Sequence, residues 1–168
     1  VNVCISKWRR ISPTSFIPLA KGVGGYMNST LAKIDAVDNG YDDAIMLGDD
    51  GTVAEGSGQN IFIVKNNNIS TPPNSTGALN GITRRTVIEI AKSKNISIEE
   101  KNLTVEDLKN ADEVFFTGTA TGVVGVVSID GDDISNGRVG EITSDLINSY
   151  EDVVNAKDDN FKSYITLI

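Results

Sequence analysis

Hydrophobic residues along this chain fall into short runs that are separated by turn residues, and this pattern predicts many short strands. Apolar runs of four to eight residues bounded by Gly, Pro, Asn or Asp are typical of buried strands. The turns Asp49-Asp50-Gly51 and Asn66-Asn67-Asn68 each lie between two such runs, so we expect hairpins there. The predicted strands are 1–6, 44–47, 52–54, 60–64, 69–71, 96–100, 114–116 and 123–129.

A second, longer periodicity predicts helices between these strands. Met27, Leu31, Ile34 and Val37 recur at helical spacing, so we expect a helix over about 27–39 that Asn39-Gly40 ends. A second helix is predicted at 82–94, with Val87, Ile88, Ile90 and Ala91 on its inner side. A third begins at Thr104, which we expect to be the N-cap with Asp107 facing back to it. A last helix is predicted at 142–153.

The balance of these elements predicts the fold class. Strands outnumber helices and several are joined by hairpin turns, which indicates an α+β fold with largely antiparallel pairing. The 168 residues suit one domain of ordinary size, and the sequence contains no internal repeat or interdomain linker. We therefore expect residues 1–168 to form a single domain.

Composition and charge narrow the classes of partner. A formal net charge of −8 disfavours a nucleic-acid partner and an anionic membrane surface. No apolar run approaches the roughly 18 residues of a spanning helix, and the first residues lack the pattern of a signal peptide. We therefore expect neither nucleic acid nor membrane as a partner, and a cytoplasmic location.

The counts of cysteine and histidine limit the chemistry further. Cys4 is the only cysteine and histidine is absent, which excludes an internal disulfide, a Cys/His zinc site and a His-based triad. We expect no metal. Proton transfers must then be made by Lys, Asp, Glu, Tyr or water.

Lys21 and Glu55 are the two residues whose context suggests chemistry. Lys21 follows the apolar residues 18–20 and precedes glycines at 22, 24 and 25, which let the backbone pass close to a ligand. If buried there, its amine has a lowered pKa and is nucleophilic. The alternative interpretations are that Lys21 is an ordinary solvated side chain and that Glu55 is an exposed carboxylate in a turn. Together the two residues suggest a Schiff-base amine and a carboxylate for a pyridinium nitrogen, as a pyridoxal-phosphate (PLP) enzyme requires.

Two further segments are candidates for binding an anion. Gly81-Ile82-Thr83-Arg84 lies at a predicted helix start, where free N–H groups and a hydroxyl make an anion cradle; alternatively, Thr83 only caps the helix. Thr117-Gly118-Thr119-Ala120 follows a buried strand, and its hydroxyls either reach a phosphate or satisfy the turn backbone.

These segments, taken together and in order, resemble a known family. The chain is similar to the large, C-terminal domain of class IV (fold type IV) PLP-dependent aminotransferases, most closely the branched-chain amino acid aminotransferases. The similarity covers nearly the whole chain. It is carried by Ala20-Lys21, Tyr26-Met27-Asn28-Ser29, Gly40-Tyr41-Asp42, the run from Ala54 to Phe62, Thr71-Pro72-Pro73, Gly81-Ile82-Thr83-Arg84, the run from Ala111 to Ala120 and Ile129-Asp130-Gly131.

The resemblance implies a role for individual residues. Lys21 forms the Schiff base with PLP and acts as general acid–base, Glu55 holds the pyridine nitrogen, and Tyr26 contacts the phenolic oxygen. The remaining cofactor residues, around the phosphate, are Leu79, Ile82, Thr83 and Thr119; Thr119 and Ala120 also face the substrate carboxylate. The implied fold is a mostly antiparallel pseudo-barrel with flanking helices.

The implied activity is transfer of an amino group from Leu, Ile or Val to 2-oxoglutarate, in a homodimer. Alternatives on the same fold are D-amino acid aminotransferase and aminodeoxychorismate lyase, and the run Gly56-Ser57-Gly58-Gln59-Asn60 favours the branched-chain group. A non-catalytic ligand-binding or dimerisation domain is the alternative from another class; retention of Lys21 and Glu55 speaks against it.

The sequence departs from the family pattern in two ways. Family members carry a smaller N-terminal domain of about a further hundred residues, which supplies a phosphate-binding arginine and much of the substrate pocket. We therefore expect this chain alone to be inactive or weakly active. Within the chain, Gln59, Asn80, Gly122 and Gly125 stand where the family usually has Glu, Pro, Glu and Pro, which affects specificity more than cofactor binding.

Overall fold

The computed structural model describes residues 1–17, 20–164 and 166. Pro18 and Leu19, part of the apolar segment expected before Lys21, lie outside the described residues. The strands are β1 (Asn2–Ile5), β2 (Asp43–Leu47), β3 (Val53–Gly56), β4 (Asn60–Lys65), β5 (Asn68–Thr71), β6 (Ile98–Glu100), β7 (Glu113–Gly118), β8 (Gly122–Val126), β9 (Ser128–Ile129) and β10 (Asp132–Asp133). The helices are α1 (Met27–Asp38), α2 (Ile82–Ser93), α3 (Val105–Lys109) and α4 (Glu141–Val154), with short 3-10 helices at Val23–Tyr26, Asn74–Thr76 and Asp159–Tyr164.

The strands form two five-stranded sheets, in the orders β10-β9-β1-β2-β3 and β6-β5-β4-β7-β8. Most pairs are antiparallel, including the predicted hairpins β2–β3 and β4–β5. The pairs β1–β2, β1–β9 and β5–β6 are parallel. The α+β class is confirmed; among the described strands, neither sheet closes into a barrel.

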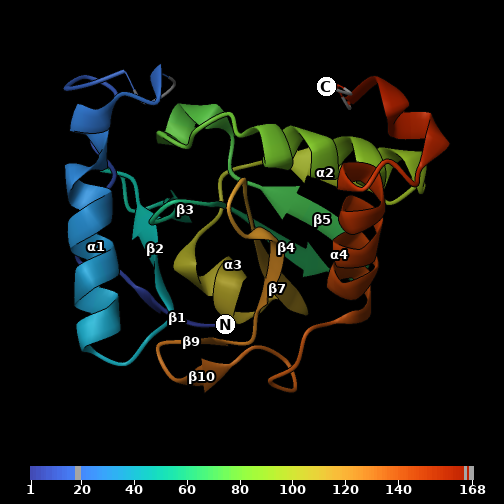
Figure 1. The fold of residues 1–168 in the computed structure, drawn as a ribbon. Coiled ribbons are helices and arrows are strands. Elements are labelled where there is room, and N and C mark those ends of the chain that lie inside the picture. The colour runs from blue at the N-terminus through green and yellow to red at the C-terminus, as the bar shows by residue number, and fades with distance from the viewer. Residues whose placement is uncertain (18–19, 165, 167–168) are drawn as a thin grey trace.

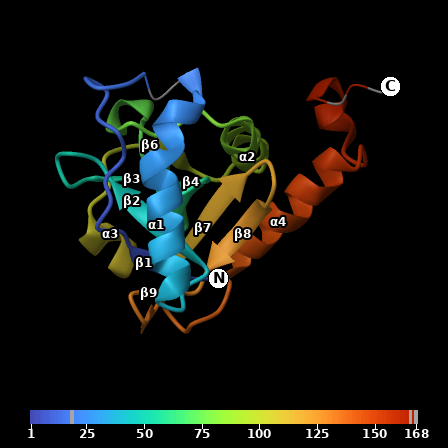
Figure 2. The ribbon, with the colours of Figure 1, turned by 60° about the vertical axis from the view of Figure 1, so that its left-hand side comes forward.

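The two sheets pack against each other, and helices cover their outer faces (Figures 1 and 2). Alternate side chains of one strand point to opposite faces of a sheet. On β4, Ile61 and Ile63 enter the core between the two sheets, whereas Phe62 and Val64 pack toward the helices α2 and α4. The other sheet is covered by α1, against which Ala44 and Met46 of β2 pack.

The segment 123–129 does not form the single strand that its apolar pattern predicts. It divides into β8, which pairs with β7, and β9, which pairs with β1 in the other sheet. At the junction, the backbone N–H of Val127 donates to the carbonyl of Val1 at 2.9 Å. The prediction was wrong because both halves contain buried apolar residues, so the pattern does not reveal a change of partner sheet.

Helix α1 lies where the periodicity predicts it, but the residues that form the period do not make the core. Ser29, Ala32 and Ala36 are buried, whereas Met27, Ile34 and Val37 are more than half exposed. Small side chains allow the helix to approach β2 closely, and this leaves the larger apolar side chains on the outer face.

Other local predictions are confirmed. Thr104 caps α3 as a capping box: its hydroxyl accepts from the Asp107 N–H at 3.1 Å, and the Asp107 carboxylate accepts from the Thr104 N–H at 2.7 Å. Val87, Ile90 and Ala91 are buried on the inner side of α2, and Ile88, which was expected there too, is only partly buried. In the described part of the chain, no helix is long and apolar enough to cross a membrane.

Candidate active site

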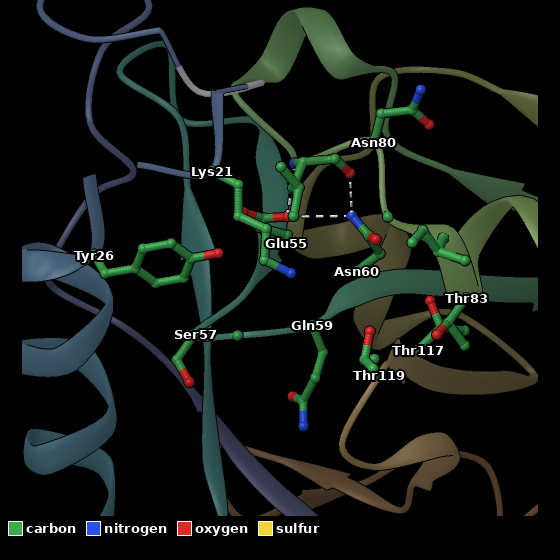
Figure 3. A pocket seen from close by; sticks show the side chains of 15 residues that line it. Lys21, Tyr26, Glu55, Ser57, Gln59, Asn60, Asn80, Thr83, Thr117 and Thr119 are labelled. Atoms are coloured by element: carbon green, nitrogen blue, oxygen red, sulfur yellow. Dashed lines mark hydrogen bonds between the residues drawn. The ribbon is translucent and has the colours of Figure 1, made fainter. Parts of the chain in front are cut away.

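Residues from several separate segments surround a cavity of about 210 Å³ where β3, β4 and β7 meet the start of α2. All the residues to which the resemblance gives a cofactor role line it, namely Lys21, Tyr26, Glu55, Leu79, Ile82, Thr83 and Thr119. Figure 3 shows the Lys21 amine and the Tyr26 hydroxyl pointing into the cavity from one side, with Thr83 and Thr119 on the other. Ala120, expected at the substrate carboxylate, is exposed and does not line the cavity.

Glu55 is a buried carboxylate on β3, not the exposed turn residue of the alternative interpretation. Only 5% of it is exposed. Its Oε2 accepts hydrogen bonds from the Leu79 N–H at 2.9 Å and from Nδ2 of Asn60 at 3.1 Å. Its Oε1 makes an ion pair with Arg10 at 2.9 Å. The protein thus fixes this carboxylate before any ligand enters the cavity.

The electrostatic state of Glu55 reflects two opposed influences. Burial raises the pKa of the Glu55 carboxyl group, because the charged form loses its hydration. The Arg10 charge is the largest influence in the other direction, followed by the Leu79 N–H, Arg84 and Lys21. The carboxylate therefore depends on its basic neighbours for its charge.

Lys21 lies in a loop at the rim of the cavity and is exposed, contrary to the buried position considered above. The 3-10 helix Val23–Tyr26 that follows contains no buried residue, so little of the protein covers this lysine. The Lys21 backbone has a φ of 49°, in the left-handed region that non-glycine residues seldom adopt. Such strain is concentrated at functional sites, where the surroundings hold it in place.

The glycines that follow Lys21 make room for a side chain of the protein itself. A Cβ atom on Gly22 or on Gly25 would lie 2.9 Å from the ring of Phe16. At these two positions the contact with Phe16 is itself a reason for the missing Cβ, and the expected close approach to a ligand stays a prediction. The two glycines let the loop that carries Lys21 pack on Phe16.

The N-terminus of α2 forms the far wall of the cavity. Gly81 is the N-cap and no side chain caps the helix, so the first N–H groups of α2 have no partner within the helix. The Thr83 hydroxyl lies 3.4 Å from the Tyr150 hydroxyl, which contradicts the alternative that Thr83 only caps the helix. These groups and the helix dipole favour an anion at this end of the cavity.

Two buried polar atoms in the cavity wall have no hydrogen-bond partner among the described residues. They are Oγ1 of Thr117 and Oε1 of Gln59. Buried polar groups are normally paired, so such atoms in a cavity wall mark contacts for a polar ligand. Together with the free N–H groups of α2, they fit a phosphorylated, polar cofactor.

Arg10, Ser57 and Asn60 belong to the site, but the sequence interpretation gave them no role. Asn60 helps to tie Glu55 to the segment before α2, because its Nδ2 donates both to Glu55 and to the carbonyl of Leu79 at 2.7 Å. The Ser57 hydroxyl donates to buried Asp43 at 2.5 Å and so fixes the loop after Glu55. The motif around Glu55 contains Ser57 and Asn60, so it could have indicated that both belong to the site. No sequence motif indicates a role for Arg10.

Gly81 allows Asn60 to occupy this position, which leads to a prediction. A Cβ at residue 81 would collide with Oδ1 of Asn60, whereas a Cβ at Gly58, in the same cavity wall, would meet nothing within 4 Å. We expect Gly81→Ala to destabilise the protein by about 1–3 kcal/mol, because Asn60 must leave Glu55 or the helix must shift. Chemical denaturation of Gly81→Ala beside Gly58→Ala tests this; equal stability of the two variants would contradict it.

Known proteins share both this sequence and this fold. The family model described as amino-transferase class IV matches residues 1–129. A probable branched-chain-amino-acid aminotransferase of Aquifex aeolicus is 44% identical over 99% of this chain and 54% of its own length. The branched-chain-amino-acid aminotransferase of Pseudomonas aeruginosa is 44% identical over 100% of this chain and 54% of its own. The chain thus spans about half the length of the curated relatives it matches.

Solved structures agree over nearly the whole chain. The branched-chain aminotransferase from Thermoproteus uzoniensis, crystallised with norvaline, superposes with a TM-score of 0.95 at 41% identity, over 99% of this chain and 55% of that one. A T.th. branched-chain amino acid aminotransferase, complexed with N-(5'-phosphopyridoxyl)-L-glutamate, gives 0.96 at 37% identity, over 98% of this chain and 56% of that one. With the match to the family model, these similarities show that the chain belongs to the class IV aminotransferases.

Proposed function

We propose that this chain is the PLP-binding, C-terminal large domain of a longer branched-chain amino acid aminotransferase. The observation that carries the proposal is the buried, fully positioned carboxylate of Glu55 in the same cavity as the Lys21 amine, with the N-terminus of α2 at the far side. The relatives' names supply the substrate class, branched-chain amino acids, and we infer 2-oxoglutarate as the amino acceptor. Because the chain spans about half of these relatives, we expect full activity only from the full-length protein.

The proposed chemistry divides between the cofactor and this chain. PLP, when bound, supplies an aldehyde and an electron-withdrawing ring on which an amino group can be exchanged. The Lys21 amine would hold the cofactor through the aldehyde, and its Nζ would accept the proton that leaves the substrate Cα. The Glu55 carboxylate would accept a hydrogen bond from the N–H of the cofactor ring, and the Tyr26 hydroxyl would contact the phenolic oxygen of the cofactor. The Ile82 and Thr83 N–H groups and the hydroxyls of Thr83 and Thr119 bind the phosphate. Leu79, which the resemblance also places around the phosphate, donates its N–H to Glu55 instead.

The proposal extends to the substrate, the assembly and the location. Thr119 and Ala120 face the substrate carboxylate in the proposed complex. The full-length protein is a homodimer, which its molar mass by light scattering would show, and it acts in the cytoplasm, a location with which the single cysteine of this chain is consistent.

The proposal is tested on the full-length protein by titration with PLP and by a substrate comparison. We expect a visible absorbance band on addition of PLP, and turnover of L-leucine, L-isoleucine and L-valine with 2-oxoglutarate that exceeds turnover of D-alanine or aminodeoxychorismate. Preference for either of the last two would support the rival activities on this fold. The absence of any absorbance band would favour a non-catalytic binding or dimerisation domain.

A further inference from the structure

Arg10 lies directly behind the Glu55 carboxylate, in a position that no part of the proposed function uses. One guanidinium nitrogen is 2.9 Å from Oε1 of Glu55, and the two side chains are only 10% and 7% exposed. Arg10 does not line the main cavity; it borders a small neighbouring cavity together with Phe16, Lys21 and Tyr26. It therefore contacts Glu55 without lining the cavity proposed for the ligand.

Three other contacts hold Arg10 in this orientation. Its backbone N–H donates to the Leu47 carbonyl at 2.9 Å, its second guanidinium nitrogen donates to the Ser29 hydroxyl at 2.8 Å, and the carbonyl of Gly77 lies at 3.5 Å. The residue is thus tied to β2, to α1 and to the loop before α2. A planar guanidinium fixed at several points sets both the charge and the direction of its carboxylate partner.

The hydrogen-bond capacity of Glu55 leaves one position for a ligand. An ionised carboxylate offers about four acceptor sites on its two oxygens. Arg10, the Leu79 N–H and Asn60 occupy three of them. The remaining site is on Oε1, the oxygen that pairs with Arg10, and Glu55 lines the cavity. An N–H donor of a ligand in that cavity would occupy the fourth acceptor position of the Glu55 carboxylate.

We propose that Arg10 is the positioning residue that keeps Glu55 ionised and turned so that its free acceptor site meets the ring nitrogen of the cofactor. This inference rests on the proposed function of the cavity. Arg10 itself does not contact the cofactor, and its effect is exerted through Glu55.

The other charged groups near Glu55 do not replace Arg10. Arg84 of α2 is buried but donates to the carbonyl of Pro72 at 3.1 Å and pairs with Glu100 at 2.9 Å. Lys21 approaches from the rim of the cavity, and this amine is the group that a cofactor aldehyde would consume. Tyr26 is the remaining titratable group in the cavity wall and carries no positive charge. Without Arg10, Glu55 would have no buried cation in direct contact among the residues that the structure describes.

The first experiment uses the full-length protein without PLP and compares Arg10→Met with Arg9→Met, its exposed neighbour. Loss of Arg10 raises the folded-state pKa of Glu55 further above its unfolded value, so stability falls as pH rises between these two values. We expect Arg10→Met to lower the melting temperature much more at pH 8 than at pH 5, and Arg9→Met to change it little. Adding Glu55→Gln to Arg10→Met should remove this dependence on pH. An equal loss at every pH, unaltered by Glu55→Gln, would overturn the inference.

The second experiment uses the PLP-loaded protein and measures kcat and kcat/KM against pH. We expect Arg10→Met to shift the acidic limb to higher pH, with a loss of at least about tenfold at pH 7 that recovers as pH rises, because each unit of pKa above the pH reduces the ionised fraction tenfold. Arg10→Lys, which keeps the charge but not the planar fork, should recover part of the activity. An unchanged profile in an active protein would overturn the role of Arg10. If the unmutated protein neither binds PLP nor transaminates, the proposed function fails, whereas a pH-dependent coupling in the first experiment would still show the Arg10–Glu55 pair.

Discussion

We expect replacement of Lys21 with alanine to abolish covalent capture of PLP and to lower the proposed transamination by the full-length protein at least about ten-thousand-fold, as removal of a catalytic nucleophile does elsewhere. The reason is that Lys21 is the lysine of the main cavity wall, beside Glu55 and Tyr26. Lys21 is exposed, and alanine carries the same Cβ as lysine in the left-handed backbone, so the strain does not change. The substitution should therefore alter the stability of the PLP-free protein little.

Borohydride reduction in the presence of PLP, followed by peptide mass mapping, measures this directly. The label should appear on the peptide that contains Lys21 and be absent from Lys21→Ala. Lys92→Ala is the matched control, since Lys92 lies on α2 in an exposed pair with Glu89 and should leave labelling and turnover unchanged. Labelling of another lysine in the unmutated protein would contradict the assignment.

Phe115→Ala should cause the largest loss of stability. Phe115 is fully buried on β7, and its ring stacks on that of Phe62 with 4.8 Å between centroids and 3° between planes. The pair fills the core between the sheet and the helices α2 and α4. Removal of a buried phenyl group leaves a cavity and costs about 3–5 kcal/mol.

Urea denaturation of Phe115→Ala and of Val23→Ala measures this loss against a control, because Val23 is 90% exposed. We expect a large decrease in the denaturation midpoint for the first variant and almost none for the second. A midpoint for Phe115→Ala within the range of the control would mean that the core closes around the missing ring.

The strands and helices were largely predictable because each carries its own local signal. The Thr104 capping box and the Asp49-Asp50-Gly51 turn depend on residues close together in the chain, so a sequence pattern contains them in full. The burial of α1 was not predictable in this way. Its core contacts are made by Ala32 and Ala36, and only the nearness of β2 makes small side chains the better choice.

The site, too, contains some features that local sequence predicts and others that only tertiary packing determines. A cofactor role for Lys21 and Glu55 was suggested by the short segments around them and by their resemblance to a family, and the structure brings both to one cavity. The Arg10–Glu55 contact joins residues that are far apart in the chain, and nothing in the sequence near either one reports the other. Exposure of Lys21 and the role of Phe16 beside the glycines likewise follow from tertiary packing.

The position of β1 has a consequence for how the protein is made. Val3 lies between two parallel neighbours, paired with Asp43 on one side and with Ile129 on the other. The ribosome must therefore add all the residues between these two partners before the second can join. Until then one side of β1 is open, and closing it is a long-range pairing of the kind that slows folding and exposes a chain to aggregation.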